Sequence, residues 1–145
     1  MSRKIDKRTE SWNRQRWQQE TLKVFQAMVR YESAIDGACQ CVCCGVKGDP
    51  RDFDAGHFIS RKHNATAFSE NPPNVHPCCV RCNQHEHGNL IAYYDFMRTA
   101  YGQDAVDELK RKSRELKTWT IPELQEMRAE FRRRLKQAKD NNVNN

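Results

Sequence analysis

The sequence predicts an α+β fold in which helices at both ends enclose a cysteine-rich centre of loops and short strands. Three observations predict it. Apolar residues recur at helical spacing near both ends of the 145-residue chain. That spacing is lost over residues 36–82, which hold all seven cysteines and four of the five prolines. Two Cys-x2-Cys pairs lie within this segment, a spacing typical of zinc knuckles that staple a small core.

The length is that of one domain, and composition divides the chain into consecutive parts. We expect a single domain over 1–145 with a basic N-terminal helix (1–35), a zinc-stapled centre (36–101), C-terminal helices (102–139) and a disordered tail (140–145).

The N-terminal part predicts one long helix that Ser11 caps and that runs to about Tyr31. Between Met1 and Arg30 there are eight Lys or Arg and three Asp or Glu. The basic face is either a phosphate-contacting surface or simply a solvated one. The opposite stripe is typical of core packing and comprises Trp17, Leu22, Val24, Phe25, Met28 and Val29.

In the centre, the segment DFDAGHFIS (52–60) has the aromatic and branched residues of a strand, and Pro72–Pro73 predicts a loop. Helical spacing returns at about Arg81 and is expected to persist until Gly102. Its apolar side comprises Leu90, Tyr93, Tyr94 and Met97.

Two further helices are predicted after Gly102. The first covers roughly 103–117, with Leu116 on its apolar side. The second opens with the capping box Thr120-Ile-Pro-Glu123 and runs to about Lys139. Its apolar stripe comprises Leu124, Met127, Phe131 and Leu135.

Composition and charge narrow the function. The formal charge of +6 and pI near 9.0 favour a polyanionic partner, most simply nucleic acid, over a merely soluble basic protein. The basic N-terminus has no apolar signal region, and no run is long enough for a membrane span. We therefore expect a cytoplasmic protein with metal-bound rather than disulfide-bonded cysteines.

The cysteine spacing predicts a structural zinc site. Cys41 and Cys44, followed by Gly45, form one knuckle, and Cys79 and Cys82 form the other. The alternative is a redox dithiol or unliganded thiols, although a redox motif would need only one such pair. The remaining three cysteines are expected to be small buried residues: Cys39, Cys43 and Cys78.

Once the four zinc ligands are assigned, the order of the remaining histidine and asparagine residues suggests a second site. His57 lies in the predicted strand, Asn74 precedes the second knuckle, and Asn83 and His87 follow it four residues apart. If both lie on one helix, they share a face. This order resembles the HNH, or ββα-metal, nucleases. That resemblance implies that His57 is the general base, that Asn74 holds its ring, and that helix residues bind one divalent cation.

A closer resemblance, covering about residues 36–138, is to the phage NinG/Rap recombination endonucleases. It implies a zinc-stapled ββα-metal core and a DNA endonuclease acting on Holliday junctions and D-loops in phage recombination. The residues that carry it are Asp54-Ala-Gly-His57-Phe58, Phe68-Ser-Glu-Asn71, Asn74-Val-His76, Cys79-Val-Arg-Cys82-Asn83-Gln-His85, Gly88-Asn89-Leu90, Gly102-Gln-Asp-Ala-Val-Asp-Glu108 and Trp119-Thr-Ile121.

Phosphodiester hydrolysis needs an activated water and stabilisation of added negative charge. We expect neutral His57 to take the proton, with its ring held by its strand partner or by Asn74. Asn83 and Asp54 would supply hard oxygen ligands to Mg²⁺ or Mn²⁺, and His87 is a third candidate ligand that competes with Glu86.

Other residues have supporting roles in this hypothesis. His76 and His85 are expected beside the site or at a phosphate, whereas His63 is a solvated or phosphate-contacting loop residue. A symmetric junction suggests a homodimer. Two alternatives remain: a zinc-stapled DNA-binding protein without catalysis, and a sequence-specific HNH endonuclease of the homing or restriction type. The candidate DNA contacts are Arg61, Lys62, Arg132, Arg133 and Arg134.

Overall fold

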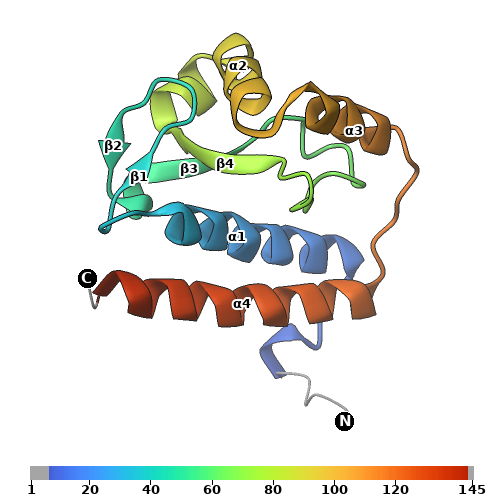
Figure 1. Cartoon of the computed structure of the whole chain (residues 1–145). Helices are drawn as coiled ribbons and strands as arrows, with labels where there is room; N and C mark the ends of the chain where they lie inside the picture. The colour runs from blue at the N-terminus through green and yellow to red at the C-terminus, as the bar shows by residue number, and fades with distance from the viewer. Residues whose placement is uncertain (1–6, 144–145) are drawn as a thin grey trace.

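The computed structural model describes residues 7–143 and confirms the mixed α+β class. Figure 1 shows three layers: two long helices below, a small antiparallel hairpin in the middle, and two shorter helices above. No helix in the described part of the chain is long and apolar enough to cross a membrane. A short 3-10 turn, η1 (Lys7–Thr9), precedes the lower layer. The proposed regions 1–35 and 140–145 extend beyond the described residues at both ends.

The lower layer is a parallel pair of helices, α1 (Arg14–Ser33) and α4 (Ile121–Val143) (Figure 1). Near their starts, Thr21 Oγ1 donates to the carbonyl of Leu124 at 3.3 Å. Near their ends, Asn142 Nδ2 donates to the carbonyl of Tyr31 at 3.2 Å. The aromatic rings of Phe25 and Phe131 meet between these contacts with centroids 4.9 Å apart. The predicted apolar stripes of the two helices therefore pack on each other.

The N-cap of α1 differs from the prediction. Asn13, not Ser11, caps the helix, because its side-chain oxygen accepts the backbone N–H of Arg16 at 2.9 Å. Ser11 lies in the turn before it, where the N–H of Trp12 bonds to the carbonyl of Thr9. The helix then starts three residues after Ser11.

The middle layer is the hairpin of β3 (Phe53–His57) and β4 (Val75–Cys79), which confirms a strand within DFDAGHFIS. A second short pair, β1 (Cys39–Gln40) with β2 (Lys47–Gly48), lies beside it, and the 3-10 turn η2 (Pro50–Asp52) leads into β3. The antiparallel register places Asp54 opposite Cys78, and His57 opposite Val75. Asp54 therefore lies close to the second Cys-x2-Cys pair, which begins one residue after Cys78.

The upper layer is not the continuous helix that the spacing predicted from Arg81 to Gly102. It consists of a π-helical turn, η3 (Arg81–His85), followed after a break by α2 (Leu90–Tyr101). Three consecutive residues in the break have positive φ: His87, Gly88 and Asn89. A right-handed helix cannot continue through such a run, so it ends and restarts.

The two later helices also differ in length from the prediction. α3 (Gln103–Ser113) stops before Leu116, whose side chain is fully exposed instead of packed. The capping box is confirmed: Glu123 accepts the backbone N–H of Thr120 at 2.9 Å, and Thr120 Oγ1 accepts that of Glu123 at 3.3 Å. α4 continues to Val143, so residues 140–143 of the expected tail are helical, and 144–145 lie outside the described residues.

Two apolar clusters hold the layers together. One lies between the helix pair and the hairpin, and includes Phe25, Phe68, Val75 and Phe131. The other lies between the hairpin and the upper layer, and includes Phe53, Tyr93, Met97, Leu109 and the buried cysteines. The hairpin is thus covered on both faces. Its polar side chains reach solvent only at the outer edges of the two strands and at the ends of the hairpin.

Candidate functional site

The four predicted zinc ligands come together. The sulfur atoms of Cys41, Cys44, Cys79 and Cys82 all lie within 4.8 Å of one another, and those of Cys44 and Cys79 are 3.7 Å apart. A tetrahedron with metal–sulfur bonds of about 2.3 Å has sulfur–sulfur edges of about 3.8 Å. This cluster could therefore hold a metal ion such as zinc.

Local backbone geometry shapes the first knuckle. Gly45 adopts φ +82°, which lets its N–H turn back to the carbonyl of Cys41 at 2.9 Å. Burial raises the pKa of the Cys41 thiol, but backbone N–H groups of Cys79, Cys44 and Cys43 lower it to about 7. The first knuckle therefore favours a thiolate, the form that binds metal.

The second knuckle joins the end of β4 to η3. The backbone N–H of Cys82 points at the sulfur of Cys79 at 3.5 Å, and Asn89 Nδ2 points at the sulfur of Cys82, also at 3.5 Å. Asn89 therefore braces this thiol. The break that follows η3 thus has a role, because the left-handed Asn89 lies against the cysteine cluster.

The three remaining cysteines lie outside the cluster, as predicted. Cys39 is buried and donates to the carbonyl of Arg30 at 3.0 Å. Cys43 is only half-buried, contrary to the expectation, and its thiol points at the carbonyl of Gly88 at 3.7 Å. Cys78 is buried against Gly56, where a side chain on the glycine would meet its sulfur at 2.6 Å.

A polar cavity of about 210 Å³ lies beside the second knuckle. Asp54 and Asn83 are in contact there: Asn83 Nδ2 donates to Asp54 Oδ2 at 3.0 Å. Gln84 Nε2 donates to the same carboxylate oxygen at 2.8 Å. The predicted acidic and carboxamide ligands are therefore brought together by the hairpin and η3. The cavity is lined by Gln26, Arg30, Asp54, Ala55, Arg61, Asn83 and Gln84.

Sequence reasoning missed three residues of this cavity. Gln84 follows Asn83 directly, and that adjacency was the available signal. Gln26 and Arg30 come from α1, one helical turn apart. Nothing in the sequence could place α1 against the hairpin at this point, because the contact depends on tertiary packing.

His57 lies at the end of β3, and its ring is held differently from the prediction. Its Nε2 is 3.0 Å from the carbonyl of Ala67, rather than bonded to its strand partner Val75 or to Asn74. A carbonyl only accepts hydrogen bonds, so Nε2 carries the proton in the neutral ring, and Nδ1 is the basic nitrogen.

The surroundings of His57 keep it neutral. Burial lowers its pKa below the ordinary value of 6.5, against an opposing effect of the Ala67 carbonyl, and the charge of Arg61 lowers it further. His57 is not among the described residues that line the cavity. Arg61 connects His57 with the cavity, because Arg61 lines the cavity and its positive charge lowers the pKa of His57.

Asn74 is fully buried and supports His57 indirectly. Its Oδ1 accepts the N–H of Ile59 at 2.8 Å, and its Nδ2 donates to the carbonyls of Ile59 at 3.0 Å and Thr66 at 3.1 Å. Thr66 immediately precedes Ala67, whose carbonyl holds His57. Asn74 therefore fixes the loop that positions the ring, instead of touching the ring.

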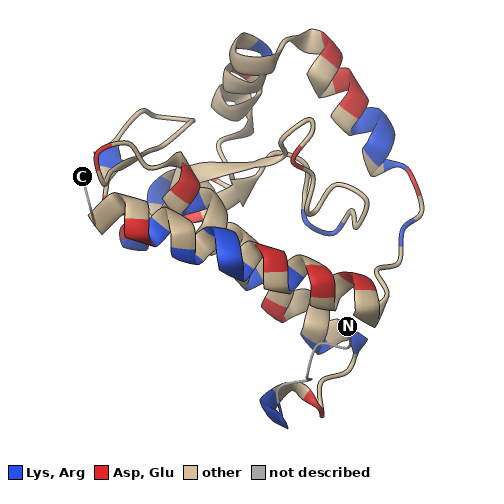
Figure 2. Cartoon of the chain, turned by 60° about the horizontal axis from the view of Figure 1, so that its bottom comes forward, with Lys and Arg blue, Asp and Glu red and all other residues tan. Residues whose placement is uncertain are grey.

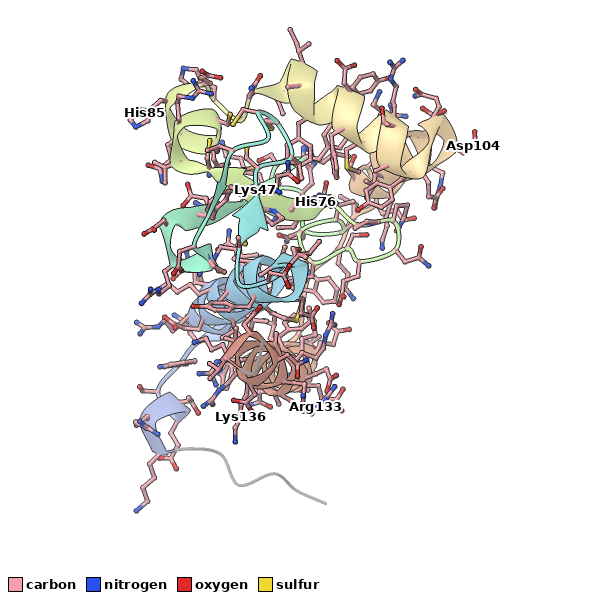
Figure 3. The ribbon with its side chains drawn as sticks, turned by 60° about the vertical axis from the view of Figure 1, so that its left-hand side comes forward. Lys47, His76, His85, Asp104, Arg133 and Lys136 are labelled. Carbon is pink, nitrogen blue, oxygen red and sulfur yellow. The ribbon has the colours of Figure 1, made fainter. Side chains whose placement is uncertain are left out.

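His76 is an interior residue, which excludes contact with a phosphate. Its Nε2 is 2.7 Å from the hydroxyl of Tyr101, and its Nδ1 is 2.9 Å from that of Tyr93, which in turn donates to the carbonyl of Gly56 at 2.8 Å. Burial lowers the pKa of His76 to about 4. Figure 3 contrasts it with His85, which points outward from η3.

The proposed pairing of Asn83 and His87 on one helix face is wrong. η3 ends at His85, and His87 follows it in an exposed left-handed conformation with φ 51°. Its role as a metal ligand thus has no support from helix geometry. Glu86, the alternative candidate ligand, is exposed, and its Oε1 lies 3.8 Å from Nε of Arg81.

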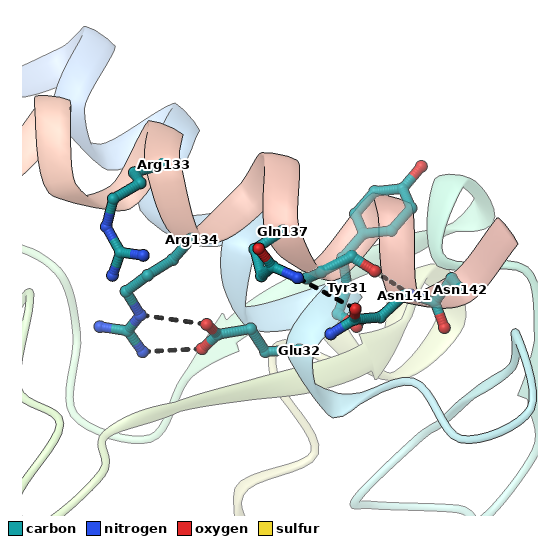
Figure 4. Close-up of a pocket in the computed structure, with 8 residues that line it drawn as sticks. Tyr31, Glu32, Arg133, Arg134, Gln137, Asn141 and Asn142 are labelled. Atoms are coloured by element: carbon teal, nitrogen blue, oxygen red, sulfur yellow. Dashed lines mark hydrogen bonds and ion pairs between the residues drawn. The ribbon is translucent and has the colours of Figure 1, made fainter. Parts of the chain in front are cut away.

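The candidate DNA contacts fall into two groups. Arg61 and Lys62 are exposed in the loop after β3, and so is the neighbouring His63. On α4, Arg134 is paired with Glu32 at 2.7 Å and with Glu70 at 2.8 Å, along a groove of about 490 Å³ (Figure 4).

Arg133 pairs with Glu130 at 2.6 Å, whereas Arg132 forms no ion pair with any described residue. Figure 2 shows acidic and basic residues intermixed along the helix pair. Of the three consecutive arginines, Arg132 alone therefore has an uncompensated charge for a phosphate. The charge of Arg133 is balanced by a carboxylate of α4 itself, and that of Arg134 by carboxylates of α1 and of the loop before β4.

The family model and the curated relatives that match this chain all carry the same name. The family model described as "NinG: Bacteriophage Lambda NinG protein" matches residues 2–141. The chain is similar to Protein ninG of Escherichia phage lambda, at 32% identity over 120 residues, which is 83% of this chain and 56% of that protein. It is also similar to Protein ninG of Salmonella phage P22, at 30% identity over 124 residues, 86% of this chain and 58% of that protein.

The chain spans less than two thirds of the length of these relatives. A third relative, Protein ninG of Escherichia phage 933W, is 30% identical over 120 residues and is covered over 57% of its length. No solved structure gives a significant match.

Proposed function

The chain belongs to the NinG family of bacteriophage proteins, and from that premise we propose that it is a divalent-metal-dependent DNA endonuclease. Its proposed substrates are branched recombination intermediates, namely Holliday junctions and D-loops. The observation that carries the proposal is the Asp54–Asn83 pair, 3.0 Å apart in a polar cavity that also contains two arginines. A carboxylate, a carboxamide and guanidinium groups together suit a phosphodiester and a hard cation.

His57 is the proposed general base. Its Nε2 is engaged by Ala67, so Nδ1 is left to accept the proton of the attacking water. Its pKa is lowered by burial, which keeps the ring in the neutral, basic form at pH 7. Asn74 supports this role by holding Thr66, next to the carbonyl that orients the ring.

The donor set fits Mg²⁺ or Mn²⁺, since Asp54 and Asn83 offer carboxylate and amide oxygens. The amide N–H of Asn83 donates to Asp54 Oδ2, so the carboxamide must turn over for Oδ1 to face a cation. The bound ion would stabilise negative charge on the scissile phosphate and the leaving oxygen.

The arrangement of elements supports an HNH-like, ββα-metal core. The hairpin supplies Asp54 and His57, and the helical turn that follows it supplies Asn83. Zinc on the four cysteines would fix where β4 ends and η3 begins, because Cys79 and Cys82 lie on either side of that junction. The structural metal therefore would position the catalytic carboxamide.

Cleavage of a labelled four-way junction in Mg²⁺ or Mn²⁺ tests this function. We expect wild type to cut, and His57→Ala to lose about 10²–10⁴-fold in rate. Glu126→Ala changes an exposed side chain of α4 that does not line the cavity and is the control, with a change within about twofold. Tight binding without cleavage of any DNA form would favour a zinc-stapled binding protein instead. Cutting of linear duplex at one sequence would favour a site-specific endonuclease.

The two equivalent strands of a symmetric junction suggest that the enzyme acts as a homodimer. Sedimentation of the protein with and without junction DNA would show whether two chains assemble on one junction.

A further inference from the structure

Arg30 has a buried side-chain nitrogen that lacks a hydrogen-bond partner among the described residues. It lies on α1 one turn after Gln26, and both residues line the cavity that contains Asp54 and Asn83. The buried nitrogen is its Nε. A buried, charged donor without an acceptor is costly, so such a group calls for a specific explanation.

The backbone around Arg30 is held in place. The carbonyl of Arg30 accepts the thiol of Cys39 at 3.0 Å, and Gln26 Nε2 reaches the carbonyl of Ala55 at 3.5 Å. These contacts fasten this turn of α1 to β1 and to β3. The guanidinium therefore stands on a rigid element beside the cavity, which favours a preorganised contact over a flexible surface charge.

The charges of the cavity are also unbalanced. Arg30 and Arg61 line it, but neither forms an ion pair with Asp54 or with any other described residue. By contrast, Arg111, Arg133 and Arg134 all pair with glutamates on the surface. Two uncompensated guanidinium groups around one carboxylate leave an excess of positive charge, which suits a bound anion.

We propose that Arg30 binds the scissile phosphate of the DNA substrate, on the α1 side of the cavity, together with Arg61 from the loop after β3. This inference rests on the proposed nuclease function and adds α1 to the active site. A planar guanidinium can donate two parallel hydrogen bonds to a phosphate and meets the negative charge that grows in the transition state. Lysine would keep the charge and lose the paired geometry.

Kinetics of junction cleavage provide the first test. We expect Arg30→Ala to lower kcat by about 10²–10³-fold, as for loss of one preorganised donor to a developing oxyanion. Arg30→Lys should recover about tenfold of that loss, because the charge remains. Arg14→Ala is the control on the same helix, at the opposite end of α1, with a change within about twofold. The melting temperature and the spectrum of Co²⁺ bound to the four cysteines verify that each variant is folded.

A second measurement needs no catalysis. The side-chain Nε–H resonance of Arg30, assigned by comparison with Arg30→Lys, is followed by NMR as junction DNA is added to the zinc-loaded protein in buffer without Mg²⁺ or Mn²⁺. We expect it to shift on binding, and the salt dependence of binding by Arg30→Ala to be shallower by about one phosphate contact. An unshifted resonance together with an unchanged salt slope overturns the inference.

The two proposals fail differently. If wild type cuts DNA while Arg30→Ala cuts within about threefold of it, the nuclease function stands and the role of Arg30 is wrong. If wild type cuts no DNA but the Arg30 resonance shifts, Arg30 binds phosphate in a protein that is not a nuclease. If Arg30→Ala fails to fold, the Arg30→Lys rate and the wild-type resonance decide the matter.

Discussion

At the scale of single residues, the hairpin is built around the glycine that precedes His57. A side chain on Gly56 would meet the sulfur of Cys78 at 2.6 Å and Oδ1 of Asn83 at 3.0 Å. Asn83 can therefore approach the strand only because position 56 has no Cβ. The carbonyl of Gly56 in turn accepts the hydroxyl of Tyr93. The strand carrying Asp54 and His57 is thus fixed from the upper layer.

His76 makes this bracing sensitive to acid. Its folded pKa of about 4 lies below the ordinary 6.5, so the native state holds fewer protons than the unfolded chain between these values. Its contribution is complete above pH 6.5 and is lost as pH falls towards 4, by about 3 kcal/mol in all.

We therefore expect the free energy of unfolding to fall between pH 6.5 and 4, and His76→Phe to flatten that fall. Urea denaturation across this range measures it, with the exposed His63→Ala as control. The same pH slope in His76→Phe as in wild type would contradict the assignment.

At the scale of elements, sequence patterns succeeded where the signal is local. The capping box starts α4 as expected, since Thr120 and Glu123 satisfy each other's N–H groups. The stripe from Leu124 to Leu135 packs on α1, because its spacing matches the helical period. Boundaries were less accurate: Asn13 replaced Ser11 as a cap, since both residue types suit that position.

Where the outcome depended on tertiary contacts, the patterns failed. The break between η3 and α2 places Asn89 on the sulfur of Cys82, and helical spacing on both sides of it concealed the break. The cysteine cluster was predictable from residue type and spacing, and Asp54 and Asn83 were predicted through the resemblance to the HNH nucleases. The acceptor of His57, Ala67, was not, because a backbone carbonyl leaves no signature in sequence.

The capping box gives a prediction at this scale. Thr120→Ala removes the acceptor for the N–H of Glu123 and should destabilise the protein by about 1 kcal/mol. Thr118→Ala is the matched control, an exposed threonine before the helix. Thermal unfolding compares them, and equal melting temperatures for the two variants would show that the cap adds nothing.

At the scale of the whole molecule, the hairpin is held between two layers by different means. Below it, apolar side chains join α1, α4 and the strands. Beside the start of the upper layer, four cysteines join two segments of chain that are far apart in the sequence. A chain with only 37% hydrophobic residues gains from such a cross-link, since its core alone is small.

Metal removal tests that role. Cys44→Ser should lower zinc content from about one ion per chain to near zero and reduce the melting temperature strongly. Cys43→Ser changes the adjacent cysteine, which lies outside the cluster, and should retain the ion. Zinc content by atomic absorption reads out both, and equal loss in the two variants would mean that the ligand assignment is wrong.

In the proposed nuclease, DNA is cut at the cavity between β3 and η3. The most direct test is the Mn²⁺-dependent rate at which Asp54→Asn cleaves a labelled four-way junction. We predict a loss of at least about 100-fold, because the carboxylate that faces Asn83 is removed. The exposed Asp52→Asn, two residues away, should cut within about twofold of wild type. Cleavage by Asp54→Asn at the wild-type rate would show that DNA is not cut at this cavity.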